Sequence, residues 1–157
     1  MPIWGRRGLT AGEIALAGEA FAEPIDWRGV AVVQVAPAAP WGAMVPLGRT
    51  ILFGRWRAAL DFARVDLHEQ GWFVHELAHV WQAARGTVLA AAKLSAVGHA
   101  AYSADWAIER PFSAYNIEQQ AEIARFAFLA ARGRPDPKGP DLRRLAALWP
   151  LSRKTDA

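Results

Sequence analysis

The sequence predicts a compact α+β domain that is mostly helical, with a small sheet of two or three strands. Several segments combine a helix-capping residue with apolar residues at helical spacing, whereas only two short segments have the β-branched composition of strands. The chain has 157 residues, a length typical of one domain whose core needs no disulfides. We therefore expect a single domain over residues 1–157, in which about 135–157 form a C-terminal tail with one short helix.

The composition excludes several classes of protein. Hydrophobic residues make up 53% of the chain, with 8 Trp and 7 Phe, which excludes a disordered chain and predicts an aromatic-rich core or groove. No run approaches the roughly 20 apolar residues of a membrane span. The basic N-terminus lacks the following apolar stretch, roughly 7–15 residues, of a secretory signal peptide. The default location is therefore the cytoplasm, although export by a non-classical route remains open.

Cysteine usage and charge narrow the kind of site. The chain has no Cys, which removes disulfides, thiol nucleophiles and Cys-based zinc sites, so any metal must be held by His, Asp or Glu. The net charge is +3, but the arginines are scattered, and we do not expect nucleic-acid binding. That alternative predicts salt-sensitive DNA binding without metal dependence.

The first half of the chain contains one helix and the two strands. Thr10 and Glu13 form a predicted capping box for a helix over about 11–21. A β-branched run predicts a buried strand over 30–35, and a second strand is predicted over 49–56. The second strand is either only a sheet edge or a support that pairs with an extended substrate peptide. The proline-rich segment 36–48 between the strands is predicted to be a loop.

The second half is predicted to be almost entirely helical. Asp66 caps a helix that runs to about residue 84. Further helices are predicted over 87–100 and, after a loop at 102–111, over about 115–132, capped by Ser113 or Asn116. The last short helix spans about 141–149.

The most informative stretch is His75-Glu76-Leu77-Ala78-His79, inside the helix that Asp66 opens. Two histidines four residues apart lie one turn above the other, so both imidazoles can reach one cation. A zinc ion held in this way lowers the pKa of its water to about 7, while a neighbouring carboxylate such as Glu76 takes the proton. A histidine on an apolar helix is more often a core residue than a ligand. Here, however, half-buried histidines without a partner would be costly.

Catalytic zinc normally has three protein ligands, so a third must come from elsewhere in the chain. Glu118 and Glu122 lie one helical turn apart and therefore share a face. The alternative is that they belong to a solvated polar stripe. The residues after His79 that could provide the ligand are His99, Asp105, Glu109, Glu118 and Glu122.

The His-Glu-x-x-His motif, followed about forty residues later by a helical glutamate and a second acid, resembles the gluzincin branch of zinc metallopeptidases. The resemblance implies a zincin-like fold with Zn²⁺ as cofactor, His75, His79 and Glu118 as ligands, and Glu122 as the acid that orients a ligand histidine. The chain departs from the usual Asn-Glu pattern because Ile117 stands between Asn116 and Glu118. The later acid is also Glu instead of Asp, so either acid could be the third ligand.

Three motifs together are similar to small bacterial proteins labelled Vgr-related, and related cores occur in peptidase-like domains attached to secreted toxins. They are Trp-Gly-Arg-Arg-x-Leu-Thr-x-Gly-Glu at 4–13, His-Glu-Leu-Ala-His-Val-Trp-Gln at 75–82, and Tyr-Asn-Ile-Glu-Gln-Gln-Ala-Glu at 115–122. The label reflects a suspected link to type VI secretion, which makes secretion-system proteins possible partners.

Two functions follow as expectations. The first is a zinc metallopeptidase that cleaves a peptide or protein substrate, with Glu76 as general base and later acid, and with Tyr102, Tyr115 or Arg110 stabilising the oxyanion. The second is a non-catalytic zincin-scaffold adaptor or assembly component of a type VI secretion-like system. Glu76 favours chemistry, because a structural zinc site needs no base. The small size favours the adaptor, because little chain remains to form a deep cleft.

Overall fold

The computed structural model describes residues 1–35, 43–44, 48–54, 57–94 and 102–149. Its α-helices are α1 (Ala11–Ala20), α2 (Leu67–Ala84), α3 (Leu89–Leu94), α4 (Ile117–Ala131) and α5 (Leu142–Leu148). Its strands are β1 (Arg6–Gly8), β2 (Ala31–Gln34), β3 (Ala43–Met44) and β4 (Thr50–Phe53). Short 3₁₀ helices span Trp27–Gly29, Phe62–Arg64 and Phe112–Ala114. The predicted α+β class is confirmed.

The four strands form one sheet in the order β1-β2-β4-β3. The central pair β2 and β4 is parallel, whereas β1 and β3 pair antiparallel with their neighbours. The sequence predicted β2 and β4 but missed β1 and β3. The interpretation of the second strand as a sheet edge is wrong, because β4 pairs with β2 on one side and β3 on the other. The three residues of β1 carry no β-branched side chain, and β3 has only two residues within the predicted loop. The rest of that loop lies outside the described residues.

The helices begin where the capping residues predicted. Thr10 forms a complete capping box with Glu13, and the side chain of Asp66 accepts a hydrogen bond from the backbone N–H of Glu69. Asn116, one of the two predicted caps, begins α4. The helix predicted over 87–100 is described only as α3, because residues 95–101 lie outside the described part.

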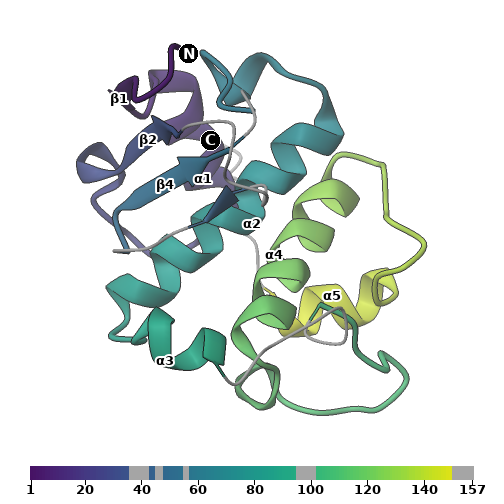
Figure 1. Cartoon of the computed structure of the whole chain (residues 1–157). Coiled ribbons are helices and arrows are strands. Elements are labelled where there is room, and N and C mark those ends of the chain that lie inside the picture. The colour runs from purple at the N-terminus through teal and green to yellow at the C-terminus, as the bar shows by residue number, and fades with distance from the viewer. Residues whose placement is uncertain (36–42, 45–47, 55–56, 95–101, 150–157) are drawn as a thin grey trace.

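Helix α2 crosses the middle of the molecule, with the sheet and α1 on one side and α4 on the other (Figure 1). Phe53 of β4, Phe62 and Phe73 of α2 stack in series, with ring centroids 4.9 and 4.4 Å apart. All three side chains are fully buried. This aromatic stack fixes one face of α2 and leaves its other face to α4.

A buried carboxylate joins the N-terminal strand to the rest of the fold. Glu13 accepts two hydrogen bonds of 2.7 Å from the guanidinium of Arg7 and one of 2.8 Å from the backbone N–H of Phe62. Since a buried charge must be paired, Glu13 locks β1, α1 and the 62–64 turn together.

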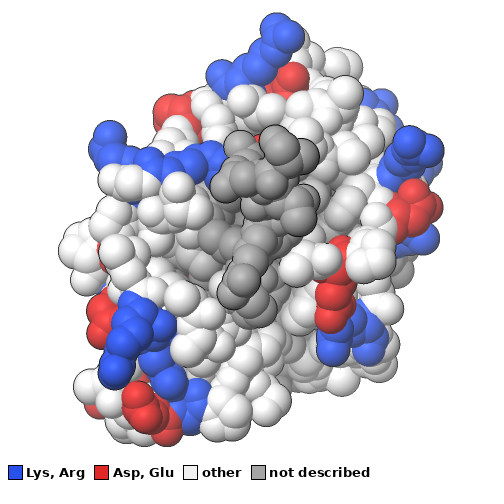
Figure 2. Space-filling model, turned by 180° about the vertical axis from the view of Figure 1, so that it is seen from behind, with Lys and Arg blue, Asp and Glu red and all other residues white. Residues whose placement is uncertain are grey.

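Charged side chains of both signs lie side by side around one face of the molecule and form no continuous basic stripe there (Figure 2). None of the helices in the described ranges has the length and apolar character of a membrane span.

Candidate metal centre

Helix α2 brings His75, Glu76 and His79 into the interior, where all three are buried. The helical turn places the two imidazole rings edge to face, with centroids 5.0 Å apart. His79 is 1% exposed, so each ring needs a polar partner from within the protein.

The partner comes from the first turn of α4. Oε2 of Glu118 lies 3.2 Å from Nε2 of His75 and 3.2 Å from Nε2 of His79. One atom from each of the three residues lies within 4.8 Å of the others, which is the kind of group that holds a metal ion. The structure therefore brings Glu118 together with both motif histidines, and places Glu122 one turn further along α4 behind His75.

The outer ring nitrogens contact two different residues. Nδ1 of His75 lies 2.8 Å from Oε1 of Glu122, the acid to which the resemblance assigns the orientation of a ligand histidine. Nδ1 of His79 lies 2.9 Å from Oε1 of Gln82. Gln82 also donates from Nε2 to the carbonyl of Ile117 at 2.9 Å. Since only the amide nitrogen donates to a carbonyl, the Gln82 oxygen faces His79 and accepts a hydrogen bond from its Nδ1.

Sequence reasoning gave Gln82 no role, although its position three residues after His79 placed it on the same side of the helix. This spacing is the feature of the sequence from which a contact between Gln82 and His79 could have been predicted.

The charges around the cluster favour a cation. Burial lowers the pKa of His75, but hydrogen bonds to Glu118 and Glu122 and the charges of Glu76 and Glu122 outweigh it and raise the pKa to about 9. Burial raises the pKa of Glu122, but its contacts with His75 and Arg125 reverse this and lower the pKa below its usual value. Without a metal ion, the cluster therefore holds a proton on His75 at neutral pH.

Glu76 lies beside the histidines with one oxygen that the fold does not use. The residue is 4% exposed, and its Oε2 is buried without a hydrogen-bond partner in the described part of the chain. Buried polar atoms are almost always paired, so an unpaired carboxylate oxygen at this position calls for a functional explanation.

Of the three expected oxyanion stabilisers, Tyr102 lies against the cluster. Its ring stacks on His75 with centroids 6.1 Å apart, and it is half exposed. Burial, followed by the charges of nearby carboxylates that include Glu118, raises the pKa of Tyr102. The guanidinium of Arg110 lies over the ring of Tyr115 at 4.3 Å, and the Tyr115 hydroxyl is buried without a partner in the described residues.

The other candidate ligands take different positions. Asp105 accepts a hydrogen bond from the backbone of Ala107, and Glu109 is exposed. His68 is exposed near the start of α2. His99 lies outside the described residues.

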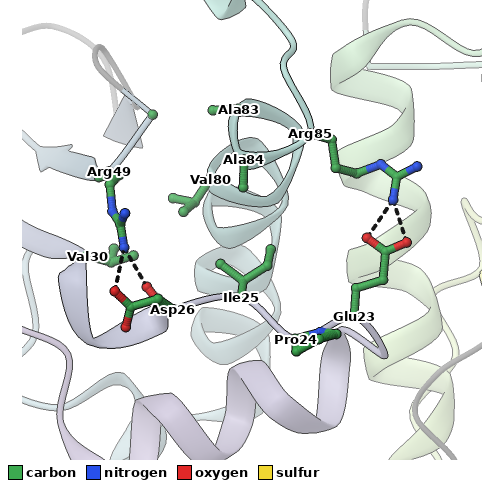
Figure 3. Close-up of a pocket in the computed structure, with 11 residues that line it drawn as sticks. Glu23, Pro24, Ile25, Asp26, Val30, Arg49, Val80, Ala83, Ala84 and Arg85 are labelled. Atoms are coloured by element: carbon green, nitrogen blue, oxygen red, sulfur yellow. Dashed lines mark hydrogen bonds and ion pairs between the residues drawn. The ribbon is translucent and has the colours of Figure 1, made fainter.

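A cavity of about 490 Å³ lies at the C-terminal end of α2, away from the histidine cluster. Two ion pairs, Arg49 with Asp26 and Arg85 with Glu23, stand on opposite sides of it (Figure 3). Its lining residues include none of the three clustered residues.

The fold and the cluster define a class: an α+β domain in which two packed helices carry a buried His-His-Glu group with a glutamate beside it. A scan against protein-family models found no match. The chain is 32% identical over 132 residues to the type VI secretion system spike protein VgrG2b of Pseudomonas aeruginosa. The match covers 78% of this chain and 13% of the spike protein.

Among solved structures, the effector domain of Pseudomonas aeruginosa VgrG2b matches with a TM-score of 0.69 and 31% sequence identity. This match covers 90% of the present chain and 83% of the effector domain. The chain therefore belongs to the family of the VgrG2b effector domain.

Proposed function

We propose that the chain is an effector domain linked to type VI secretion, and that it hydrolyses peptide bonds in a zinc-dependent reaction. Membership of the VgrG2b effector-domain family supports the link to secretion. The support for the reaction comes from the site, and one observation carries it. Oε2 of Glu118 lies 3.2 Å from both histidine Nε2 atoms, while the carboxylate of Glu76 lies beside them with an unused oxygen.

The donor atoms fit zinc. Two imidazole nitrogens and one carboxylate oxygen form a common ligand set of catalytic zinc. In this proposal His75 and His79 hold the ion through Nε2, because their Nδ1 atoms are engaged by Glu122 and Gln82. When bound, zinc supplies a Lewis acid that lowers the pKa of water to about 7 and polarises a carbonyl oxygen.

Glu76 is the proposed general base. Its free oxygen can accept the proton of the attacking water and later return it to the leaving amine. Tyr102, half exposed and stacked on His75, is the best placed of the three expected residues to donate a hydrogen bond to the developing oxyanion.

The second candidate function is a non-catalytic adaptor or assembly component that retains the same scaffold. Two observations favour it. The comparisons name a secretion spike and an effector domain, but no reaction. In addition, the cavities of about 490 and 510 Å³ in the described ranges are lined by residues outside the cluster.

One experiment separates the two functions. Wild type and Glu76→Gln, both shown to be zinc-loaded, are incubated with a mixed peptide library, and cleavage is read by mass spectrometry. Glutamine is nearly isosteric but cannot accept the proton, so we expect a loss of at least about 10²-fold. Glu69→Gln, an exposed change on the same helix, should cleave like wild type. Equal cleavage by wild type and Glu76→Gln would remove the base assignment, and no cleavage by either would favour the adaptor.

A further inference from the structure

The contact between His75 and Glu122 is the inner end of a longer chain of ion pairs. Oε2 of Glu122 accepts a hydrogen bond of 2.8 Å from Nη1 of Arg125. Nη2 of the same guanidinium donates to Oδ2 of Asp136 at 3.0 Å. The other oxygen of Asp136 accepts from the backbone N–H of Lys138 at 3.0 Å. The side chains of Glu122, Arg125 and Asp136 therefore connect a buried imidazole to the loop between α4 and α5.

These ion pairs are better shielded than ordinary surface pairs. The side chains of Glu122, Arg125 and Asp136 are only 14%, 15% and 18% exposed. An exposed pair three residues apart on a helix is worth little, because water screens it and both side chains move. Here one planar guanidinium is held by two carboxylates through separate nitrogens, which fixes its orientation.

The arrangement leaves Glu122 little freedom. Each of its two oxygens has a separate partner, His75 on one side and Arg125 on the other. Without Arg125, the second oxygen would lose its partner and the carboxylate could rotate away from the ring. Without Asp136, the long Arg125 side chain would lose its second support. His79 is supported by neutral groups instead: its Nδ1 faces the amide of Gln82, which in turn donates to Oε1 of Gln120 at 3.0 Å.

We infer that Arg125 and Asp136 are positioning residues of the metal centre, which hold Glu122 on His75 and couple the centre to the α4–α5 loop. This inference rests on the proposed zinc site. Its consequence is that a change in the loop that displaces Asp136 weakens metal binding, although Asp136 contacts no ligand of the metal.

Zinc affinity, measured at neutral pH by competition with a chromophoric chelator, tests the inference without any assay of activity. Removing a residue that orients a metal ligand typically weakens binding about 10- to 100-fold, and we expect that range for Glu122→Gln. Arg125 acts one contact further out, so Arg125→Gln should weaken binding by roughly 3- to 10-fold, and Asp136→Asn by roughly 3-fold. Arg125→Lys keeps the positive charge but loses the two guanidinium nitrogens that contact Glu122 and Asp136. Its zinc affinity should therefore lie between those of wild type and Arg125→Gln.

The double variant Glu122→Gln/Arg125→Gln provides the decisive comparison. If Arg125 acts only through Glu122, the double variant should bind zinc no more weakly than Glu122→Gln alone. A purely structural contribution of Arg125 would instead add its own loss. Arg132 provides a matched control, because it lies just beyond the end of α4 and pairs with Glu19 at 2.7 Å, away from the cluster. Arg132→Gln should leave zinc affinity unchanged.

Circular dichroism and thermal unfolding of the metal-free forms check that each variant folds. If Arg125→Gln does not fold, Asp136→Asn, a substitution in the loop, tests the same inference. Wild-type affinity in both Arg125→Gln and Asp136→Asn would overturn this inference alone, as would additive losses in the double variant or an equal loss in Arg132→Gln. Absence of zinc binding by wild type would overturn the proposed metal site and this inference with it.

Discussion

His75 and His79 face the same carboxylate oxygen, but residues of different charge hold them from behind. Glu122 is an acid, so it makes the His75 ring more basic, and in the metal-free protein it favours a proton there. Gln82 is neutral and fixes the tautomer of His79 without adding charge. The two histidines therefore differ in the charge behind them: His75 has a carboxylate at its Nδ1, whereas His79 has a neutral amide there.

The first prediction separates the roles of the two acids. Glu118→Ala should abolish tight zinc binding, because it removes the oxygen that both Nε2 atoms face. Glu122→Ala should weaken binding by only about 10- to 100-fold. Zinc titration of both variants checks this, and the reverse ranking would exchange the two assignments.

The second prediction concerns the pH dependence of the metal-free protein. The pKa of His75 rises from 6.5 to about 9 on folding. A group whose pKa is raised by folding adds stability that is fully present below its unfolded pKa and is lost as pH rises through its folded pKa. The midpoint temperature of thermal unfolding of chelator-treated protein should therefore decrease as the pH is raised from neutral to above about 9. In His75→Gln this decrease of the unfolding midpoint with pH should be absent. The same pH dependence in the variant as in wild type would contradict the protonation assigned to His75.

At the scale of elements, the site depends on where α4 begins. Asn116 caps this helix and forms a capping box with Gln119, so the first turn presents Glu118 to the histidines. The Gln82 side chain also connects α2 to this turn, because it donates a hydrogen bond to the carbonyl of Ile117. The position of Glu118 therefore follows from local backbone capping together with one contact between the helices.

The third prediction tests this capping. Asn116→Ala should lower the free energy of unfolding by about 1 kcal/mol and also weaken zinc binding, because the first turn of α4 carries Glu118. Asp141→Ala removes the equivalent cap of α5, where Asp141 accepts from the backbone of Arg144. That variant should lose similar stability with unchanged zinc affinity. Denaturant unfolding and zinc titration of both variants provide the comparison, and equal effects on zinc would contradict the capping argument.

The elements also show which features the sequence predicts and which it does not. Caps are local, so Thr10, Asp66 and Asn116 could be identified from the sequence. Strand β1 could not, because its three residues become a strand only by pairing with β2. The helical spacing brought His75 and His79 together, but the choice of Glu118 over Glu122 as the residue facing both Nε2 atoms depends on how α4 packs on α2.

For the whole molecule, the central position of α2 links the core to the cluster (Figure 1). One part of α2 packs into the aromatic stack through Phe73, while His75 and His79 meet α4. A metal ion between these helices would join two elements that otherwise meet through side-chain packing and hydrogen bonds. Zinc should therefore stabilise the native fold as a whole.

The fourth prediction follows from this linkage. Zinc at roughly 1,000 times its dissociation constant adds about 4 kcal/mol to the free energy of unfolding. For a domain of this size, removing it with a chelator should lower the midpoint of thermal unfolding by roughly 10 °C. Glu118→Ala, which lacks the shared oxygen, should unfold at the same temperature with and without chelator. A chelator effect of equal size in that variant would place the metal elsewhere.

The most direct test of the account is the zinc content of the purified protein, measured by elemental analysis beside His75→Ala and His79→Ala. Because two buried imidazoles and one carboxylate converge in the cluster, we predict about one zinc ion per wild-type chain and a loss of zinc in each variant. Full zinc content in both variants, or none in wild type, would contradict the assignment of His75, His79 and Glu118 as the metal centre.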